Sequence, residues 1–262
     1  MNIHKDSYSM AKVITVINQK GGVGKTTTAH AIGAWLQAKG HKVLFVDLDQ
    51  QSNLSYATGA ANSSYNSLEI FVSGKLDKVQ VQTTAGGYDV VPASPMLANV
   101  DAVLNATGKE YRLKEALANL QGYDFVILDT PPSLNIVTVN ALTASDYALI
   151  PAQADIFSLQ GITQLGQTIQ AVKRYTNPDL NVLGIVLTRH NTRTILSRDL
   201  QQVITDTASQ LNTKVYEQHI REAVTIKEAQ AMRKDIFTYD AKSKAAHDYS
   251  QLMQEIYQDI QQ

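Results

Sequence analysis

Residues 18–30 of this 262-residue chain read NQKGGVGKTTTAH, and this stretch decides the fold. A phosphate-binding P-loop follows the pattern G-x-x-x-x-G-K-[ST], whose last three letters are supplied by Gly24, Lys25 and Thr26. The first glycine of the pattern falls at Gln19, and Lys20 beside it is a lysine that the pattern does not require. The stretch therefore has most of a P-loop, with one glycine missing and one cation added.

The surroundings of this loop favour a nucleotide site over a chance glycine-rich turn. An apolar strand leads directly into the loop, and a helical pattern begins at about Lys25. Glycines let backbone N–H groups close on phosphate oxygens, and the helix N-terminus adds a partial positive charge. Lys25 would contact the β- and γ-phosphates, and the Thr26 hydroxyl would ligate Mg²⁺. The predicted nucleotide-binding residues are Lys20, Gly21, Gly22, Val23, Gly24, Lys25, Thr26 and Thr27.

Lys20 has two interpretations. A lone lysine at the mouth of a loop is usually a solvated side chain. Here Lys25 already holds the phosphates, so a second cation cannot easily fold back onto them. Lys20 could instead project outward and meet the phosphates of a facing subunit, as an arginine finger acts in trans.

Strand-like and helix-like stretches alternate along the chain, which is typical of parallel βαβ units. The predicted strands are 12–18, 42–47, 88–92, 124–129, 146–151 and 181–188. The predicted helices are 25–39, 94–120 in two pieces, 134–143, 159–175, 194–211 and 242–260. We expect the α/β P-loop NTPase fold, a mostly parallel twisted sheet with helices on both faces. The Ser-, Asn-, Thr- and Gly-rich region 52–87 shows no clear period.

One domain is expected over residues 12–262, because no linker, repeat or low-complexity tract divides the chain. Residues 1–11 would form a short tail, and the first nine could be an upstream extension because Met10 directly precedes the first strand. The chain contains no cysteine, which excludes disulfides, iron–sulfur clusters and cysteine nucleophiles. Without a membrane-length apolar run or a signal peptide, we expect a cytoplasmic protein.

Acidic residues end two of the predicted strands. Asp47, Asp49 and Gln51 are spaced by two at the end of the second strand, so in an extended conformation they point to one side. Asp129 ends the strand 124–129, where a carboxylate can hold a magnesium-bound water. Open α/β sheets bind ligands at the carboxyl ends of their strands, so these side chains are aimed at the nucleotide site. The alternative is that such aspartates merely cap loops.

KGGVGKTT resembles the deviant Walker A motif of the ParA/MinD group of P-loop ATPases, whose signature is the extra lysine. NQKGGVGKTT is similar to the ParA/Soj branch in particular, and replacement of the first glycine is common in the group. The resemblance covers about residues 12–258 and continues in VDLDQQ (46–51), FVILDTPPS (125–133), PAQADIFSLQGITQL (151–165) and EAVTIKEAQAMRKDIFTYDAKSKAAHDY (222–249).

This resemblance implies a weak, Mg²⁺-dependent ATPase that converts ATP to ADP and phosphate. It assigns catalysis to Lys20, Lys25 and Asp49, with Asp49 positioning the attacking water, and metal binding to Thr26, Asp47 and Asp129. It also implies an ATP-dependent sandwich homodimer, in which Lys20 crosses to the partner's nucleotide. That dimer would bind nonspecific DNA and associate with the nucleoid, and a ParB-like centromere-binding protein would stimulate hydrolysis during plasmid or chromosome segregation.

The DNA-binding surface implied by the family lies in residues 189–234, which contain eight Lys/Arg and five Asp/Glu. Solvated helical surfaces are the alternative interpretation of this modest excess. A family arginine falls here at Thr225, whose place Arg221 or Lys227 could take. The candidate DNA-binding residues are Arg193, Arg198, Arg221, Lys227 and Arg233.

Rival functions remain, and one of them is a related switch that positions some other cargo. A MinD-like membrane-positioning ATPase would end in a basic amphipathic helix, but residues 245–262 contain no Lys or Arg, so we expect their apolar stripe to pack on the core and not on a membrane. A metabolic P-loop enzyme of the dethiobiotin synthetase kind would not need Lys20 in trans. The tail before the first strand is too short for the helix-turn-helix domain of longer plasmid ParA proteins, so operator-specific autorepression is not expected by that route.

Overall fold

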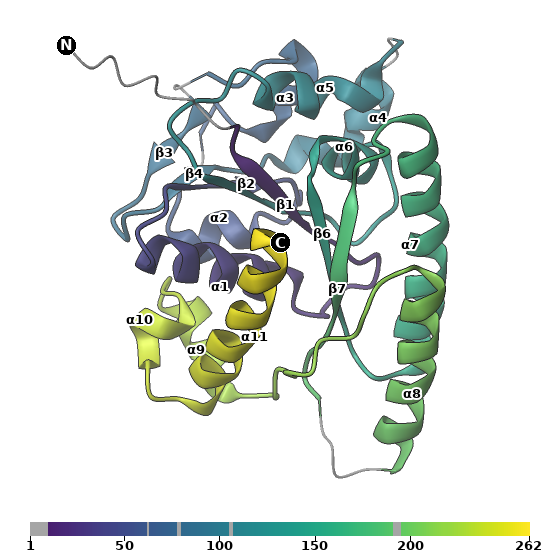
Figure 1. Cartoon of the computed structure of the whole chain (residues 1–262). Helices are drawn as coiled ribbons and strands as arrows, with labels where there is room; N and C mark the ends of the chain where they lie inside the picture. The colour runs from purple at the N-terminus through teal and green to yellow at the C-terminus, as the bar shows by residue number, and fades with distance from the viewer. Residues whose placement is uncertain (1–9, 62, 78–79, 105–106, 191–194) are drawn as a thin grey trace, which may run out of the picture.

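Seven strands form one sheet in the computed structural model of this chain, in the order β3-β4-β2-β5-β1-β6-β7 (Figure 1). The structure describes residues 10–61, 63–77, 80–104, 107–190 and 195–262. All neighbouring strands are parallel except β3, which pairs antiparallel with β4. The strands are β1 (Lys12–Val16), β2 (Val43–Asp47), β3 (Gln82–Thr83), β4 (Asp89–Val91), β5 (Phe125–Asp129), β6 (Tyr147–Ala152) and β7 (Asn181–Leu187).

Helices cover both faces of the sheet, which confirms the predicted fold class (Figure 1). One face is covered by α1 (Lys25–Ala38), α9 (Val224–Ala231), α10 (Ile236–Asp240) and α11 (Lys244–Gln261). The other face is covered by α3 (Ser67–Ser73), α4 (Val100–Val103), α5 (Arg112–Leu117), α6 (Ile136–Ala144), α7 (Ile156–Tyr175) and α8 (Ile195–Gln210). The short helix α2 (Asn53–Thr58) follows β2.

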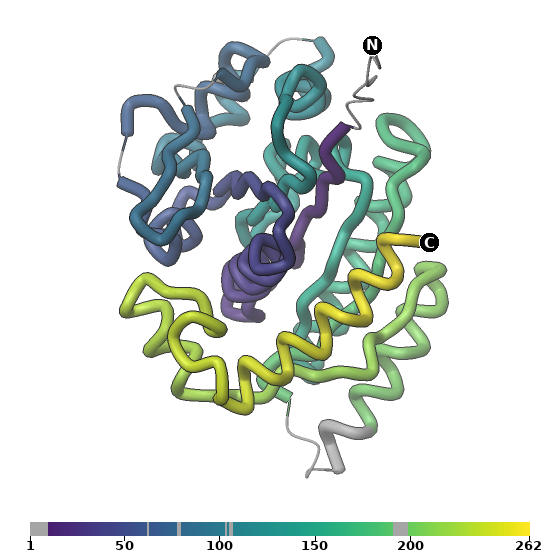
Figure 2. Tube along the Cα trace, turned by 60° about the vertical axis from the view of Figure 1, so that its left-hand side comes forward, coloured from purple at the N-terminus to yellow at the C-terminus, as the bar shows by residue number. Residues whose placement is uncertain are grey.

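Alternate residues of the central strands enter different cores. In β5, Phe125 and Ile127 pack on the α1 and α11 side, whereas Val126 and Leu128 pack on the α3 to α6 side. Both faces of the sheet are therefore shielded from water, which explains why the sequences of these strands are continuously apolar. The C-terminal helix α11 crosses α1 on the same face of the sheet (Figure 1, Figure 2). Its apolar stripe is buried. This stripe packs on the core as expected from the sequence.

The six predicted strands all form, each with ends within two residues of the prediction. Region 94–120 forms the two helical pieces expected, residues 95–103 and 109–117. Each begins as a 3-10 helix and continues as an α-helix: η2 (Pro95–Asn99) with α4, and η3 (Lys109–Tyr111) with α5. The helix expected over 159–175 begins three residues earlier, at Ile156, because the Asp155 side chain caps it. Residues 1–9 of the expected tail lie outside the described residues.

Several short elements escaped prediction. Region 52–87 forms α2, α3 and β3, and α9 and α10 form between residues 224 and 240. None of these elements exceeds eight residues, so the apolar period has too little length to show. Gly59 and Gly74 end α2 and α3 in the left-handed conformation, with φ of 81° and 68°. Within the described part of the chain, no helix has the length and apolarity needed to cross a bilayer.

Candidate nucleotide-binding site

The loop between β1 and α1 has the backbone geometry of a phosphate cradle. Gly22 and Gly24 adopt left-handed conformations, with φ of 75° and 86°, which side-chain-bearing residues rarely tolerate. A Cβ atom added to Gly21 or Gly22 would meet nothing within 4 Å, so protein packing does not require glycine there. Thr188 supports the loop from behind, where its hydroxyl donates to the Val23 carbonyl at 2.7 Å.

This loop opens into a cavity of about 440 Å³ at the carboxyl ends of the strands. The predicted residues Gly21, Gly22, Gly24, Lys25, Thr26, Thr27 and Asp49 all line it. Gln51, Tyr56, Pro132, Arg189 and Gln230 line it as well. Sequence reasoning placed Gln51 near the site but missed Tyr56, Arg189 and Gln230, which no motif marks. Gln230 of α9 donates to the Thr27 hydroxyl at 2.8 Å and so ties α9 to the cradle.

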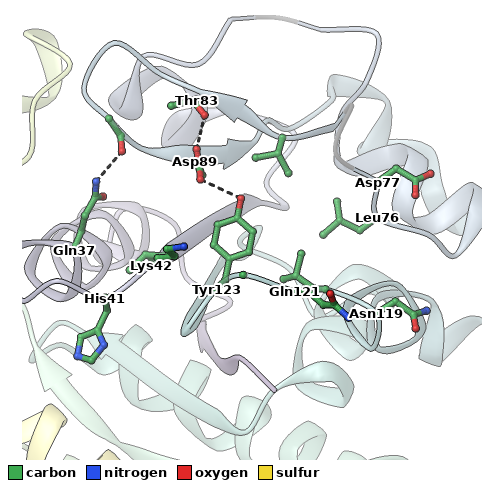
Figure 3. A pocket seen from close by; sticks show the side chains of 15 residues that line it. Gln37, His41, Lys42, Leu76, Asp77, Thr83, Asp89, Asn119, Gln121 and Tyr123 are labelled. Carbon is green, nitrogen blue, oxygen red and sulfur yellow. Dashed lines mark hydrogen bonds between the residues drawn. The ribbon is translucent and has the colours of Figure 1, made fainter. Parts of the chain in front are cut away.

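A larger cavity, of about 670 Å³, lies at the amino ends of β2, β4 and β5 (Figure 3). Several of its polar side chains are paired with the protein. Asp89 accepts hydrogen bonds from Thr83 at 2.6 Å and from Tyr123 at 3.1 Å, and Gln37 donates to the Gly87 carbonyl at 2.7 Å. Open α/β sheets bind ligands at the opposite, carboxyl edge. We therefore assign the nucleotide to the smaller cavity.

Lys25 is buried at the centre of the site. Its ammonium donates to the Lys20 carbonyl at 3.1 Å and is thus already held inside the loop. Burial lowers the pKa of Lys25, while the charges of Asp129 and Asp49 oppose that shift. The side chain therefore lies among the carboxylates, where a phosphate could replace the backbone carbonyl as its partner.

Asp47 and Asp129 stand side by side on β2 and β5, and both are fully buried. Asp47 is occupied by the protein: it accepts hydrogen bonds from the Ser55 N–H at 2.8 Å, the Ser55 hydroxyl at 2.7 Å and the Asp49 N–H at 3.1 Å. Both oxygens of Asp129 have no hydrogen-bond partner within the described ranges. Burial raises the pKa of Asp47 to about 6, and burial together with the Asp47 charge holds the pKa of Asp129 well above its usual range.

These residues fit Mg²⁺ bound to a nucleotide. Two buried carboxylate oxygens without partners are suited to a cation or to the water molecules that it carries. Thr26 lines the same cavity and is close enough to Asp129 to influence its pKa. No group of three or more His, Asp or Glu side chains that could hold a metal occurs in the part of the chain that the structure describes. Magnesium would therefore depend on Thr26, Asp129 and the phosphates, with Asp47 holding β2 and α2 in place.

Asp49 has a different environment from its neighbours. It lines the cavity, and one of its oxygens accepts a hydrogen bond from the Gln51 N–H at 3.0 Å. Burial raises the pKa of Asp49, whereas that hydrogen bond and the Lys25 charge lower it. Its carboxylate therefore belongs to the same cavity as the phosphate loop.

Removal of the Asp129 charge is expected to stabilise the free subunit. The pKa of Asp129 is raised in the folded state, so its contribution to stability is present at low pH and is lost as the pH rises. We expect Asp129→Asn to raise the free energy of unfolding at about pH 7.5 by about 1–3 kcal/mol, and the gain to shrink toward pH 5. Urea unfolding at both pH values measures this difference. The variant should also lose the stabilisation that Mg²⁺ and ATP give to the wild type, and a lower stability at both pH values would contradict the assignment.

Lys20 does not point outward from the subunit. Its ammonium forms an ion pair with Asp155 and donates to Gln153 at 3.2 Å and to Ser158 at 3.4 Å, all in its own chain. Sequence reasoning missed this contact, although the position of Asp155 before the helical pattern was a signal for a cap. The predicted crossing of Lys20 to a partner stays a prediction, and it requires this side chain to move.

The candidate DNA-binding residues lie on different parts of the surface. Arg193 lies outside the described residues, and Arg198 belongs to α8, on the far side of the sheet from α9. Arg221 forms a bidentate ion pair with Asp248, with both N–O distances 2.7 Å. Lys227 is exposed on α9, and the Arg233 guanidinium lies 4.6 Å from the Tyr56 ring beside the nucleotide cavity. The structure thus brings Arg221 and Lys227 together, at one small cavity, and leaves Arg198 apart.

The sequence model of a family described as "AAA domain" matches residues 11–182. Chromosome partitioning protein ParA of Caulobacter vibrioides is 38% identical over 252 residues, which cover 94% of this chain and 93% of the relative. Sporulation initiation inhibitor protein Soj of Bacillus subtilis is 40% identical over 253 residues, which cover 94% and 98%. These similarities span the described site and the C-terminal helices.

Solved structures agree with the fold. A Mycobacterium smegmatis structure described as cobyrinic acid a,c-diamide synthase, with an ATP analogue and magnesium bound, is 40% identical, with a TM-score of 0.70 over 75% of this chain and 80% of its own. The septum site-determining protein MinD of Pyrococcus horikoshii, with Mg-ADP, has a TM-score of 0.75 over 94% of this chain and 96% of its own. Its identity is 23%, so it shows the fold alone.

Proposed function

This chain belongs to the ParA/Soj family of chromosome-partitioning ATPases, and on that premise we propose that it is an ATP-driven switch for DNA segregation. ATP and Mg²⁺ assemble two subunits into a sandwich dimer, and the dimer binds DNA without sequence preference. A ParB-like centromere-binding protein stimulates the slow hydrolysis of ATP and so releases the dimer from the nucleoid, in the cytoplasm. The observation that carries the proposal is the second lysine, Lys20, beside a complete phosphate cradle.

The surroundings of Lys20 support a dimer that closes over the nucleotide. Ile156 and Phe157 follow the Lys20 partner Asp155 and are 60% and 70% exposed. Tyr56 on the cavity wall and Met232 after α9 are also exposed. Large apolar side chains exposed around a functional site are typical of a surface that a partner covers. A second copy of the chain placed over this rim would bury them.

Nucleotide-dependent assembly tests this proposal. Light scattering after size-exclusion chromatography should give a dimer with Mg-ATP and a monomer with Mg-ADP or without nucleotide. A monomer under all three conditions, at protein concentrations above about 10 µM, would falsify the sandwich-dimer switch, because interfaces of ordinary size reach micromolar affinity or better.

A basic surface for DNA is supported by the C-terminal elements. Arg221 lines one cavity with Lys227 and another with Lys242 and Lys244, so these residues are neighbours; we call Arg221, Lys227, Lys242 and Lys244 the basic surface. The nearby acids Asp235 and Asp248 are buried and hydrogen-bonded within the protein. Asp248 neutralises Arg221, Glu222 and Glu228 are exposed nearby, and Asp240 is half-buried, so contacts with DNA would rest on Lys227, Lys242 and Lys244.

Charge reversal on the basic surface is expected to weaken DNA binding. Lys242→Glu with Lys244→Glu should lower the affinity of the ATP-bound protein for random duplex DNA at least about tenfold and reduce the slope of log K against log salt by about 2. Fluorescence anisotropy at two or more salt concentrations measures both quantities. Lys114→Glu with Lys173→Glu, on helices of the other sheet face, is the charge-matched control. Equal losses in both double variants would assign the effect to net charge and would contradict the surface.

A further inference from the structure

Gln19, where the P-loop pattern has glycine, and Lys20, which the pattern does not require, contact α7 and the turn that precedes it. The Gln19 amide donates to the Gln164 side chain at 2.5 Å, and a Cβ atom on Gly161 would lie 3.4 Å from the Gln19 side chain. The Gln19 side chain therefore lies close to the α7 backbone at Gly161, and its hydrogen bond joins the loop to the helix. A glycine at position 19 would have no side chain for this contact, so the departure from the pattern gives the loop a second anchor.

The backbone at Lys20 is also fixed. Its N–H donates to the Asn18 side chain at 3.0 Å, and Asn18 in turn donates to the Pro151 carbonyl of β6 at 2.7 Å. The Lys20 side chain is 25% exposed and reaches Gln153, Asp155 and Ser158, which all lie at the junction of β6 and α7. In the single subunit, this lysine is therefore held by its own chain on three sides.

Asp155 has two roles at this junction. One of its oxygens accepts the Ser158 N–H at 2.8 Å and caps α7, while the other pairs with Lys20. Burial raises the pKa of Asp155, but the hydrogen bonds from Lys20 and from the α7 N–H groups outweigh that effect and leave it below its ordinary value. The carboxylate is thus charged at neutral pH and is the anion that faces the Lys20 ammonium.

We propose that Asp155 is a positioning residue that holds Lys20 in its own subunit until an ATP-bound partner offers a stronger anion. This inference rests on the proposed function, because it presupposes the dimer. A lysine held by Asp155 and docked toward α7 cannot also extend to a facing subunit. The triphosphate bound to the partner carries more negative charge than the Asp155 carboxylate, so it attracts the Lys20 ammonium more strongly. Because the Lys20–Asp155 ion pair must be broken first, a higher ATP concentration is needed for dimerisation.

The Lys20–Asp155 ion pair lies beside exposed apolar residues, on the surface that the partner would cover. Ile156 and Phe157 are adjacent to Asp155 in the sequence and form the first turn of α7. A subunit that packs on them would approach the Lys20–Asp155 pair directly. Release of Lys20 and burial of these side chains would therefore occur in one step.

Asp155→Asn separates the two roles, because asparagine caps helices as well as aspartate does but carries no charge. We expect the ATP concentration at half-maximal dimerisation to fall by about 2- to 5-fold, the range expected for a partly exposed ion pair. Asp179→Asn, an exposed aspartate between α7 and β7, is the charge-matched control and should leave that concentration unchanged. The affinity of the monomer for ADP should be equal in the wild type and Asp155→Asn.

The outcomes distinguish this inference from the function on which it rests. A wild type that dimerises with ATP while Asp155→Asn needs the same or more ATP would overturn the restraint alone. If Asp155→Asn raised the affinity of the monomer for ADP as much as it lowered the ATP concentration needed for dimerisation, the restraint would also be overturned. Removal of a negative charge near the phosphates would then explain both changes. A wild type that never dimerises with ATP would overturn both.

Discussion

Replacing Lys20 with alanine is expected to abolish ATP-dependent dimerisation and to lower ATP hydrolysis at least about 1,000-fold, the range measured for cationic fingers supplied in trans. The reason is electrostatic, since the proposed mechanism adds Lys20 of the partner to Lys25 and Arg189, which line the cavity, to offset the charge of the transferred phosphoryl group. Lys20 precedes Gly21, which lines the cavity, and its backbone is tethered to Asn18, so the proposed step needs only its side chain to leave Asp155. Steady-state phosphate release and size-exclusion chromatography measure the two effects.

Two controls separate a trans role from simple damage to the loop. Lys75→Ala, an exposed lysine outside the site, should behave as the wild type. Mixing Lys20→Ala with Lys25→Ala should restore part of the activity, because one site of the mixed dimer then has its own Lys25 and the partner's Lys20. If the mixture stays inactive while each variant still binds a wild-type subunit, Lys20 acts within its own subunit and the sandwich mechanism is wrong.

Asp49→Ala is expected to separate binding from hydrolysis. The Asp49 carboxylate lines the cavity above the cradle and is less tied to the protein than Asp47, which Ser55 holds by two hydrogen bonds. In the proposed mechanism Asp49 positions the attacking water and accepts its proton, so its loss should lower the hydrolysis rate about 10²- to 10⁴-fold. ATP binding does not need that group, so the variant should remain an ATP-bound dimer.

The measurement is hydrolysis and dimer lifetime in the same sample. Asp49→Asn is the conservative companion, because it keeps the shape and the hydrogen bond to the Gln51 N–H but removes the base. Rapid turnover in Asp49→Ala would move the catalytic role to another group. Loss of ATP binding would show instead that Asp49 helps to hold the nucleotide.

The central strands and the phosphate loop could be predicted from the sequence because their signals are local and strong. A buried parallel strand needs an unbroken apolar run, and residues 125–128 provide one. A phosphate cradle needs small residues at fixed spacing, which Gly22 and Gly24 supply. The role of Asp129 followed from its place at the end of a strand, and the absence of hydrogen-bond partners in the described structure agrees with it.

The remaining features depend on contacts between distant parts of the chain. The sequence suggested Arg221 as a DNA-binding residue, but in the structure it forms an ion pair with Asp248, 27 positions later. The contact between Lys20 and Asp155 joins residues 135 positions apart, which no period or spacing reveals. The short helices α2, α9 and α10 gain their stability from packing and caps. They are too short for a helical period of apolar residues to be visible in the sequence.

The central claim is that ATP switches this protein onto DNA, and binding to random-sequence duplex DNA tests it most directly. The wild type should be compared with Mg-ATP, Mg-ADP and no nucleotide, at about 50 and 200 mM salt, with Asp49→Ala used to prevent hydrolysis. We predict tight binding with ATP alone, and a loss of affinity of about tenfold or more between the two salt concentrations. Equal binding in all nucleotide states, or binding to anionic liposomes without binding to DNA, would contradict the account.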